Sequence, residues 1–279
     1  MKLLNQIRLT NKLKCSQGYR MKIHQIRNAT IIITYNDKRF LIDPWLMPAG
    51  FMPGFEGAMN SNVKQPRVEL PISIDKIVDV DAVILTHFHP DHFDEFAVKA
   101  LDKNIPFFVQ NETDLNIIKN FGFKDIRIIS ENGTDFEGIK LYKTQCQHGR
   151  REVVKPMCEQ IGMPYDAMGI VFKANTEKTL YIAGDTIWCK EVSTAIDKFN
   201  PEIIIINACG ATVLVGEGER LIMDVADVKA ISDYAKSAKI IASHMDTVSH
   251  LTVTREDIKN LNLDNIIVPD DDEILKFNK

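Results

Sequence analysis

Short apolar runs separated by polar turns begin at Met21 and predict that the first part of the chain forms β-structure. The run Thr30-Ile31-Ile32-Ile33-Thr34 is rich in β-branched residues, which favour strands. Asn36 and Asp37 then mark a tight turn. We therefore predict the antiparallel start of a sheet, with strands over 22–27, 29–35 and 38–42.

Farther along, helical patterns alternate with short apolar strands, as is typical of helices packed on the face of a sheet. The predicted helices cover 94–101, 113–121, 188–199, 224–238 and 255–261. The predicted strands cover 106–109, 125–130, 139–144, 168–174, 179–183, 203–207, 240–243 and 265–268. Three stretches are predicted to be irregular loops that decide specificity, and the first of them is expected to cover the substrate: 46–71, 149–166 and 210–223.

The length of the chain bounds its domain organisation. A chain of 279 residues is within reach of one large α/β domain. Residues 1–20 carry only a loose helical spacing of apolar residues, whereas a much cleaner pattern begins at Met21. We interpret 1–20 as an N-terminal extension and 21–279 as a single domain.

The densest group of candidate metal ligands follows an apolar run that ends at Leu85. Three of the seven histidines of the chain, with one aspartate, fall within six residues as His87, His89, Asp91 and His92. In an extended segment, His87 and His89 project to the same side. Imidazole is the commonest metal ligand in proteins, and such a cluster suits zinc, manganese or iron. A polar loop with chance histidines is the alternative interpretation, and the density argues against it.

Three further apolar strands also end in a side chain that can bind a metal, namely His148, Asp185 and His244. Loops that leave the same edge of a sheet gather into one site. The seven ligands divide naturally between two ions, and Asp185 is suited to bridge them because a carboxylate has two oxygens. The proposed division is His87, His89 and His148 for one ion, and Asp91, His92 and His244 for the other.

Four other residues are candidates for supporting the metal ligands or binding the substrate, and each also has an ordinary structural interpretation. Asp43 ends a strand and would either support a metal ligand or cap a turn. Arg150 and Arg151 follow His148 and would either hold an anionic substrate or form a solvated loop surface. His250 would be a proton donor or phosphate contact, or would serve hydrogen bonding within its loop.

The motif Thr86-His87-Phe88-His89-Pro90-Asp91-His92, followed by His148, Gly184-Asp185-Thr186 and His244, resembles the metallo-β-lactamase superfamily. The resemblance implies an αββα sandwich of two mixed β-sheets flanked by helices, with a dinuclear site at one edge of the sheets. Asp43 matches a family aspartate that supports the ligands without binding metal.

A narrower resemblance points to the branch that contains L-ascorbate-6-phosphate lactonase. It rests on Asn207-Ala208-Cys209-Gly210, on Ile222-Met223-Asp224 and on His244-Met245-Asp246. Many members of that branch have no known substrate, so this resemblance says less about chemistry than the ligand motif does.

Composition excludes several other classes. The net charge is −4 and there is no long basic run, which argues against binding to nucleic acid. No stretch is long and apolar enough for a membrane span, and the N-terminus does not resemble a signal peptide. Five cysteines without a C-x-x-C spacing argue for a reducing cytoplasm. The expected partner is a small-molecule substrate, and a homo-oligomer is left open.

We therefore predict a metal-dependent hydrolase with two divalent ions, Zn²⁺ in the first place and Mn²⁺ or Fe²⁺ as alternatives. A metal-bridging hydroxide would cleave a lactone, an ester or a phosphoester of a small substrate, and an anionic substrate is one option. Asp91 is the candidate catalytic residue that shuttles a proton to the leaving oxygen.

Two other functions compete with this hypothesis. A sensor or scaffold that binds metal without turnover is one alternative, because fold does not imply function. A flavin-partnered di-iron oxidoreductase is the other. Those relatives typically carry glutamate at the second histidine of the motif, and His89 stands there in this chain.

Overall fold

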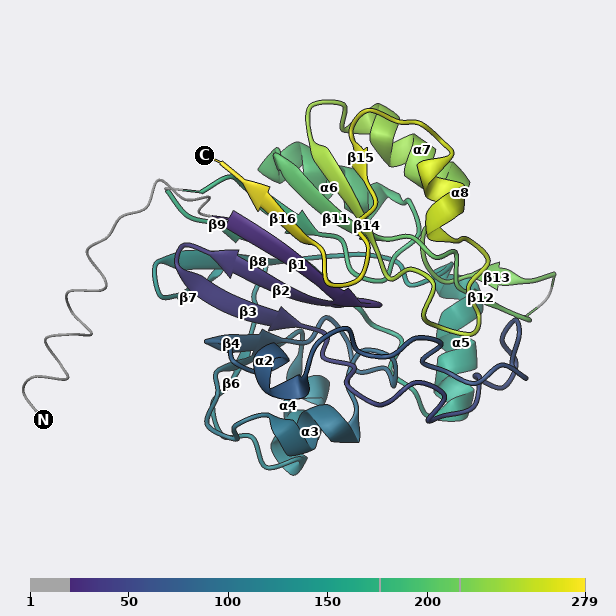
Figure 1. Ribbon diagram of the computed structural model, residues 1–279, viewed down its shortest axis with the longest axis horizontal. Helices are drawn as coiled ribbons and strands as arrows, with labels where there is room; N and C mark the ends of the chain where they lie inside the picture. Colours follow the sequence, from purple (N-terminus) through teal and green to yellow (C-terminus); the bar gives the residue numbers. More distant parts are fainter. Residues whose placement is uncertain (1–20, 176, 216, 279) are drawn as a thin grey trace, which may run out of the picture.

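The computed structural model describes residues 21–175, 177–215 and 217–278, so the predicted extension 1–20 lies outside the described residues. Within the described part, two seven-stranded sheets pack face to face, and helices cover both outer faces (Figure 1). This arrangement is the predicted αββα sandwich.

The first sheet contains the N-terminal strands. Its strands β1, β2 and β3 are antiparallel, as predicted, and β3 to β6 are parallel. In spatial order the sheet consists of β16 (Ile274–Phe277), β1 (Met21–Arg27), β2 (Thr30–Tyr35), β3 (Lys38–Ile42), β4 (Ala82–Ile84), β5 (Phe107–Val109) and β6 (Ile126–Ile128).

The second sheet is also mixed. Its strands β7 to β10 are antiparallel, and β10, β11, β14 and β15 are parallel. In spatial order the sheet consists of β15 (Ile266–Ile267), β14 (Lys239–Ser243), β11 (Ile203–Asn207), β10 (Leu180–Ile182), β9 (Gly169–Lys173), β8 (Ile139–Thr144) and β7 (Thr134–Phe136). Two mixed sheets confirm the predicted fold class.

The side-chain alternation of β2 shows how the first sheet contributes to two of the three apolar layers. Ile31 and Ile33 belong to the cluster between the two sheets, whereas Ile32 belongs to the cluster under the helices of the first sheet. Because successive side chains of a strand point to opposite faces, a strand that is apolar on both faces must be covered twice. The helices supply the second cover.

Helices are divided between the two outer faces. Buried residues of α2, α3 and α4 pack on the first sheet, and those of α6, α7 and α8 pack on the second. Several begin with a side-chain cap, such as Asp94, which accepts from the backbone of Ala97. The bounds are α2 (Ile74–Ile77), α3 (Glu95–Ala100), α4 (Glu112–Asn120), α5 (Arg151–Ile161), α6 (Lys190–Phe199), α7 (Val225–Tyr234) and α8 (Arg255–Lys259).

The prediction that 149–166 is irregular was wrong, because helix α5 occupies most of it. Pro156 and the Gly162-Met163-Pro164 segment suggested a loop. However, Val154, Met157, Cys158 and Ile161 lie at the i, i+3, i+4 and i+7 positions of one helical face. The buried residues of that face stabilise the helix despite its internal proline, and Gly162 ends it in the left-handed conformation at φ 69°.

Two further stretches contain strands that were not predicted. Loop 210–223 contains a short hairpin of β12 (Thr212–Val213) and β13 (Glu219–Arg220). The acidic residues 270–273 lead into β16, which pairs with β1 at the edge of the first sheet. Leu275 and Phe277 of β16 pack against the cluster between the sheets, so apolar burial stabilises this pairing.

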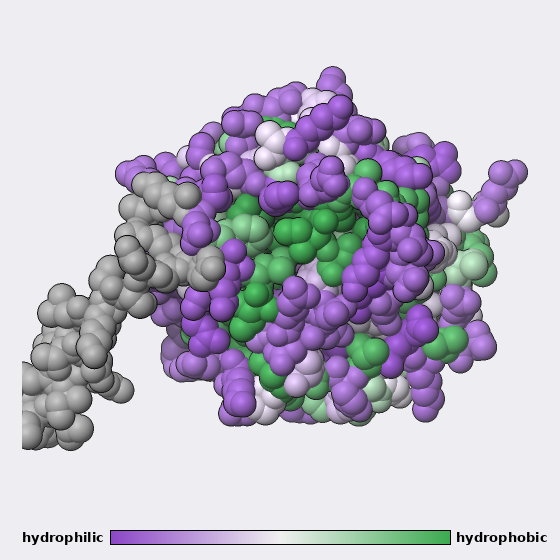
Figure 2. Space-filling view, turned by 45° about the horizontal axis from the view of Figure 1, so that its top comes forward, coloured by the Kyte–Doolittle hydropathy of each residue, from purple (hydrophilic) through white to green (hydrophobic). Residues whose placement is uncertain are grey.

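The surface is mainly polar, but Figure 2 shows a face on which a band of apolar side chains lies in a recess between polar ones. Every described helix is too short or too polar to cross a bilayer.

One buried cation holds the long loop after β3 against the sheet. The Arg27 guanidinium is fully buried and donates hydrogen bonds to the backbone oxygens of Val68, Trp45 and Met47, at 2.9, 2.8 and 2.9 Å. Without these bonds, three carbonyls would lose their partners in a dry environment.

We expect Arg27→Met to lower the free energy of unfolding by about 2–4 kcal/mol, because it leaves buried acceptors without donors. Urea denaturation followed by circular dichroism measures this change. Arg39→Met is the matched control, since Arg39 pairs with Asp79 in an exposed ion pair and such pairs contribute little. An Arg27→Met protein as stable as the parent would contradict the role given to this side chain.

Candidate metal centre

All seven predicted ligands follow the carboxyl ends of strands. The cluster from His87 to His92 follows β4, and His148, Asp185 and His244 follow β8, β10 and β14. Strands β8, β10 and β14 run in the same direction, so their ends meet at one edge of the second sheet. The end of β4 joins them there, since the amide of Met168 donates to the oxygen of Thr86 at 3.2 Å.

The Asp185 carboxylate lies at the centre of the cluster. Its Oδ2 atom is near the Nε2 atoms of four histidines, at 3.2 Å from His92, 3.5 Å from His148, 3.8 Å from His87 and 4.0 Å from His244. One oxygen that faces ring nitrogens of both predicted halves has the position of a bridging ligand. The predicted bridging role of Asp185 is compatible with this geometry.

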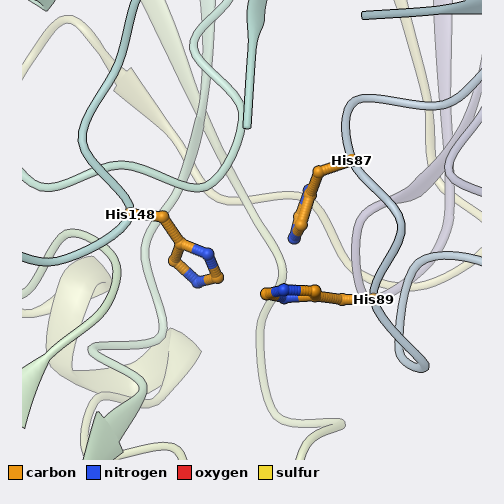
Figure 3. A group of neighbouring side chains, drawn as sticks. All are labelled: His87, His89 and His148. Carbon is orange, nitrogen blue, oxygen red and sulfur yellow. The ribbon is translucent and has the colours of Figure 1, made fainter. Parts of the chain in front are cut away.

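The ligand atoms form three overlapping groups in which all atoms lie within 4.8 Å of one another. His87, His89 and His148 form the first group, and Figure 3 shows their rings converging on a common space. The second contains Asp91, His92 and His244, with 3.4 Å between Asp91 Oδ2 and His244 Nε2. The third joins His87 and His92 to Asp185. The first two groups match the predicted division of the ligands.

Asp43 orients two of the ligands from outside the cluster. Its Oδ2 is 2.9 Å from His92 Nδ1 and accepts from the Thr86 hydroxyl at 2.8 Å. The same hydroxyl lies 3.0 Å from His87 Nδ1. Both histidines therefore present Nε2 to the cluster, which is the usual effect of a carboxylate behind a metal-binding imidazole. The geometry agrees with the predicted supporting role of Asp43.

The remaining histidines are oriented in different ways. His89 Nε2 is 2.7 Å from the oxygen of Pro164, so Nδ1 is its free nitrogen. His244 has Nδ1 beside the Cys209 thiol at 3.5 Å and turns Nε2 toward the cluster. His148 turns Nε2 toward Asp185, while its Nδ1 has no hydrogen-bond partner among the described residues.

Buried charges explain the electrostatics of the site. Burial alone would raise the pKa of Asp185 and lower that of His92. The attraction between them reverses both effects, so the pKa of Asp185 lies well below its usual range and that of His92 rises to about 10, with help from Asp43 and Asp91. His87 and His148 show the opposite behaviour, because burial and neighbouring imidazoles lower their pKa values. The site thus combines ionised carboxylates with a charged imidazole, His92, and with the neutral imidazoles of His87 and His148.

This donor set fits divalent metal ions. The carboxylates of Asp91 and Asp185 are buried and need positive charge nearby. His87 Nε2 is buried without a hydrogen-bond partner in the described structure and faces the other ligands. Imidazole nitrogen with carboxylate oxygen suits Zn²⁺, Mn²⁺ and Fe²⁺, and the residues in place could hold such ions.

Sequence reasoning missed two asparagines that serve this site. Asn207 ends β11 and donates from Nδ2 to Asp185 Oδ1 at 2.6 Å. Asn28, in the turn between β1 and β2, donates to the oxygen of Asp91 at 3.1 Å and lies 3.2 Å from His244 Nε2. The sequence offered a signal for Asn207, because it is a polar residue directly after the apolar run Ile203-Ile204-Ile205-Ile206. No local pattern singled out Asn28.

The structure separates the predicted arginines from the cluster. Arg150 is bound by Glu219, with 2.6 Å between Nη2 and Oε2, and half of the Arg151 side chain is exposed beside Asp166. Neither lines the cavity that opens onto the ligands, although His250 does. Arg151 instead lines a smaller polar pocket on another side of His148.

The chain belongs to the metallo-β-lactamase superfamily, since residues 38–245 match the family model described as the beta-lactamase superfamily domain. It is 43% identical over 268 residues to the UPF0173 protein YddR of Bacillus subtilis (strain 168), which covers 92% of this chain and all of the relative. Membership of this chain in the branch that contains L-ascorbate-6-phosphate lactonase stays a prediction.

Two solved structures are similar over nearly the whole chain. One is a possible metal-dependent hydrolase from Veillonella parvula DSM 2008, with 40% identity, a TM-score of 0.87 and coverage of 93% of this chain and 100% of that one. The other is an isothiocyanate hydrolase from Delia radicum gut bacteria, with 37% identity, a TM-score of 0.86 and coverage of 92% and 99%.

We expect Asp43→Ala to weaken metal binding about 10–100-fold, because it releases His92 directly and His87 through Thr86. Titration of the metal-free protein with Zn²⁺ against a competing chelator measures the affinity. His24→Gln is the control, since His24 pairs with Asp272 and belongs to none of the metal-binding groups of the described residues. Unchanged affinity in Asp43→Ala would show that the ligands are oriented without this carboxylate.

Proposed function

We propose that this chain, a metal-dependent hydrolase of the metallo-β-lactamase superfamily, adds water to an electrophilic carbon of a small, uncharged and largely apolar substrate. One observation carries the proposal. The cavity above the metal ligands has apolar walls, and no Lys or Arg of the described residues lines it.

The cavity has a volume of about 490 Å³, which is within the usual range for small-molecule sites. Helix α5, the β12–β13 hairpin and the loop after β3 form its walls. Their apolar lining residues include Phe55, Val154, Met157, Ile161, Met163, Val213, Leu214 and Leu221. At its base lie His89, Asp91, His148, Asp185 and His244. This lining supports a substrate whose apolar groups would contact the walls and whose polar reacting group would face the ligands.

The walls of the cavity favour a substrate whose groups away from the metal ligands are uncharged. Transfer of a charged group into an apolar site is costly unless an opposite charge is present. Arg150 is engaged with Glu219, and Arg151 lies outside the cavity. Glu56 is the charged side chain at the lining besides the ligand carboxylates, and it would repel an anion.

The isothiocyanate group is the first reacting group to test, because the similar structure from Delia radicum gut bacteria carries that activity in its name. The carbon of R–N=C=S is electrophilic, and R can be entirely apolar. The oxygen of water adds to this carbon, both protons of that water pass to the nitrogen, and the carbon–nitrogen bond breaks, which gives R–NH₂ and COS. Lactones and esters share an electrophilic carbon and are the next class, ahead of phosphoesters.

The residues of the cluster would have different roles in this reaction. His87, His89 and His148 would hold one ion, Asp91, His92 and His244 the other, and Asp185 would contact both. Bound divalent ions would lower the pKa of water and polarise the group that is attacked. Asp91 stays ionised because His92 and His244 outweigh its burial and hold its pKa well below the usual range. Its carboxylate can accept a hydrogen bond from the attacking water and pass a proton to the leaving atom.

The test is turnover by the zinc- or manganese-loaded protein on three panels: benzyl and phenethyl isothiocyanates, aryl-substituted lactones and esters, and phosphodiesters. We expect the isothiocyanates to be consumed with release of amine and COS. Asp185→Ala is the inactive control, because it removes the ligand at the centre of the cluster. Preference for phosphodiesters would contradict the proposal, and metal-loaded protein inert on all panels would favour a sensor or scaffold.

We expect Met157→Glu to raise KM for an apolar substrate at least tenfold, because it places a carboxylate in the apolar wall. Bound metal, measured by elemental analysis, should not change, since Met157 is not among the metal-binding groups of the described residues. Lys155→Gln on the same helix is the control, because Lys155 is exposed and lies outside the cavity lining. Equal KM values for Met157→Glu and parent would place the substrate elsewhere.

A further inference from the structure

His250 is a buried histidine that lines the cavity but belongs to none of the three metal-binding groups in the described structure. It lies in the segment after β14, six residues beyond His244, and its exposed fraction is 5%. A polar side chain this deeply buried beside a candidate reaction centre normally has a partner.

Hydrogen bonds on both sides hold the segment of His250 in place. Its own carbonyl oxygen accepts from the amide of Thr212 at 3.0 Å. The preceding residue, Ser249, donates from its amide to Gln65 Oε1 at 3.0 Å. The amides of Thr252 and Val253 donate to the oxygen of Cys209. The backbone around His250 is therefore anchored to the loop after β3 and to the segment that leads into the hairpin.

The imidazole itself has no hydrogen bond to any described residue. Its Nδ1 atom is fully buried without a partner, so Nε2 is the nitrogen through which the ring can reach the cavity it lines. The ring of Phe55 packs edge-on against it, with 5.2 Å between centroids and 73° between planes. Phe55 also lines the cavity, so the aromatic contact orients the imidazole at the wall.

The buried Nδ1 determines where a neutral ring carries its proton. An N–H group buried without an acceptor is rarer and costlier than an unpaired acceptor. The favoured tautomer therefore has a bare Nδ1 and a proton on Nε2. Burial, together with the neighbouring His244, lowers the pKa of His250 to about 4 despite the attraction of Asp91, so the ring is neutral near pH 7.

We propose that His250 is a catalytic residue whose Nε2–H donates a hydrogen bond to the substrate heteroatom that becomes negatively charged as water adds to the carbon. This inference rests on the proposed function and gives that reaction a hydrogen-bond donor that is not a metal ligand. In an isothiocyanate, the acceptor is the nitrogen or the sulfur of the N=C=S group. A donor held in place before the reaction stabilises this charge without reorganisation, and loss of such a donor typically lowers kcat about 100–1,000-fold.

The kinetic experiment compares metal-loaded parent, His250→Leu and His250→Gln proteins on benzyl isothiocyanate. We expect His250→Leu to lower kcat about 100-fold with KM changed less than threefold, because the bond strengthens only in the transition state. The kcat of His250→Gln should be at least tenfold higher than that of His250→Leu, since the glutamine amide can donate a hydrogen bond. Metal content and melting temperature should match the parent in both variants, and His24→Gln is the control away from the site.

Two kinetic outcomes would overturn the assignment. If His250→Leu keeps kcat within threefold of the parent, the imidazole serves only to pack against Phe55. If either variant loses bound metal in proportion to its activity, His250 is a metal ligand and not a substrate donor.

A second measurement does not depend on the substrate. Long-range ¹H–¹⁵N spectra of histidine-labelled, zinc-loaded protein distinguish the two neutral tautomers from the charged ring, and His250→Gln assigns the signal by its disappearance. A neutral ring protonated on Nε2 at pH 7 supports the donor role, and a charged ring or a proton on Nδ1 overturns it. If the parent leaves isothiocyanates intact but the Nε2–H tautomer is observed, the proposed substrate fails while the donor assignment stands.

Discussion

The buried Asp185 carboxylate is the constraint on which the rest of the site depends. One of its oxygens lies within 4.0 Å of the Nε2 atoms of four histidines, which come from three loops and both sheets. A negative charge in so dry a place is tolerated only where positive charge is supplied close by. The imidazoles supply positive charge, divalent ions bound between them would supply more, and Asn207 donates a hydrogen bond to the second carboxylate oxygen. The two sheets must therefore keep their relative position for the site to exist.

The same edge of the sandwich separates two kinds of chemistry. The base of the cavity is made of imidazoles and carboxylates whose orientations are set by Asp43, Thr86 and the oxygen of Pro164. Its walls are apolar and come from segments inserted between the strands, chiefly helix α5 and the β12–β13 hairpin. The Arg150–Glu219 ion pair joins the start of that helix to the hairpin. In the proposed reaction, the strand ends would supply the reactive groups and the inserted segments would select the substrate.

Sequence reasoning succeeded where the signal was local and failed where it was not. Short apolar runs predicted most strands of both sheets, and the strands that end in His or Asp mark the edge where the site forms. Helix α5 was missed because its proline and glycine outweighed the helical spacing of Val154, Met157 and Ile161. Strand β16 was missed because its partner, β1, lies at the opposite end of the chain. The arginines after His148 were weighed as anion ligands, but Glu219 and Asp166 are their neighbours.

The sequence by itself determined which side chains are available as ligands and that they follow strands, because residue type and spacing are local properties. The apolar run with the dense cluster at His87–His92 predicted a metal site and, with His148, Asp185 and His244, correctly indicated the superfamily. Only the tertiary structure decided which ligand atoms converge, which nitrogen each histidine presents, and that an apolar cavity with His250 at its wall lies above them. These properties depend on contacts between residues far apart in the chain, such as Asn28 with His244, and no local pattern encodes such a distance.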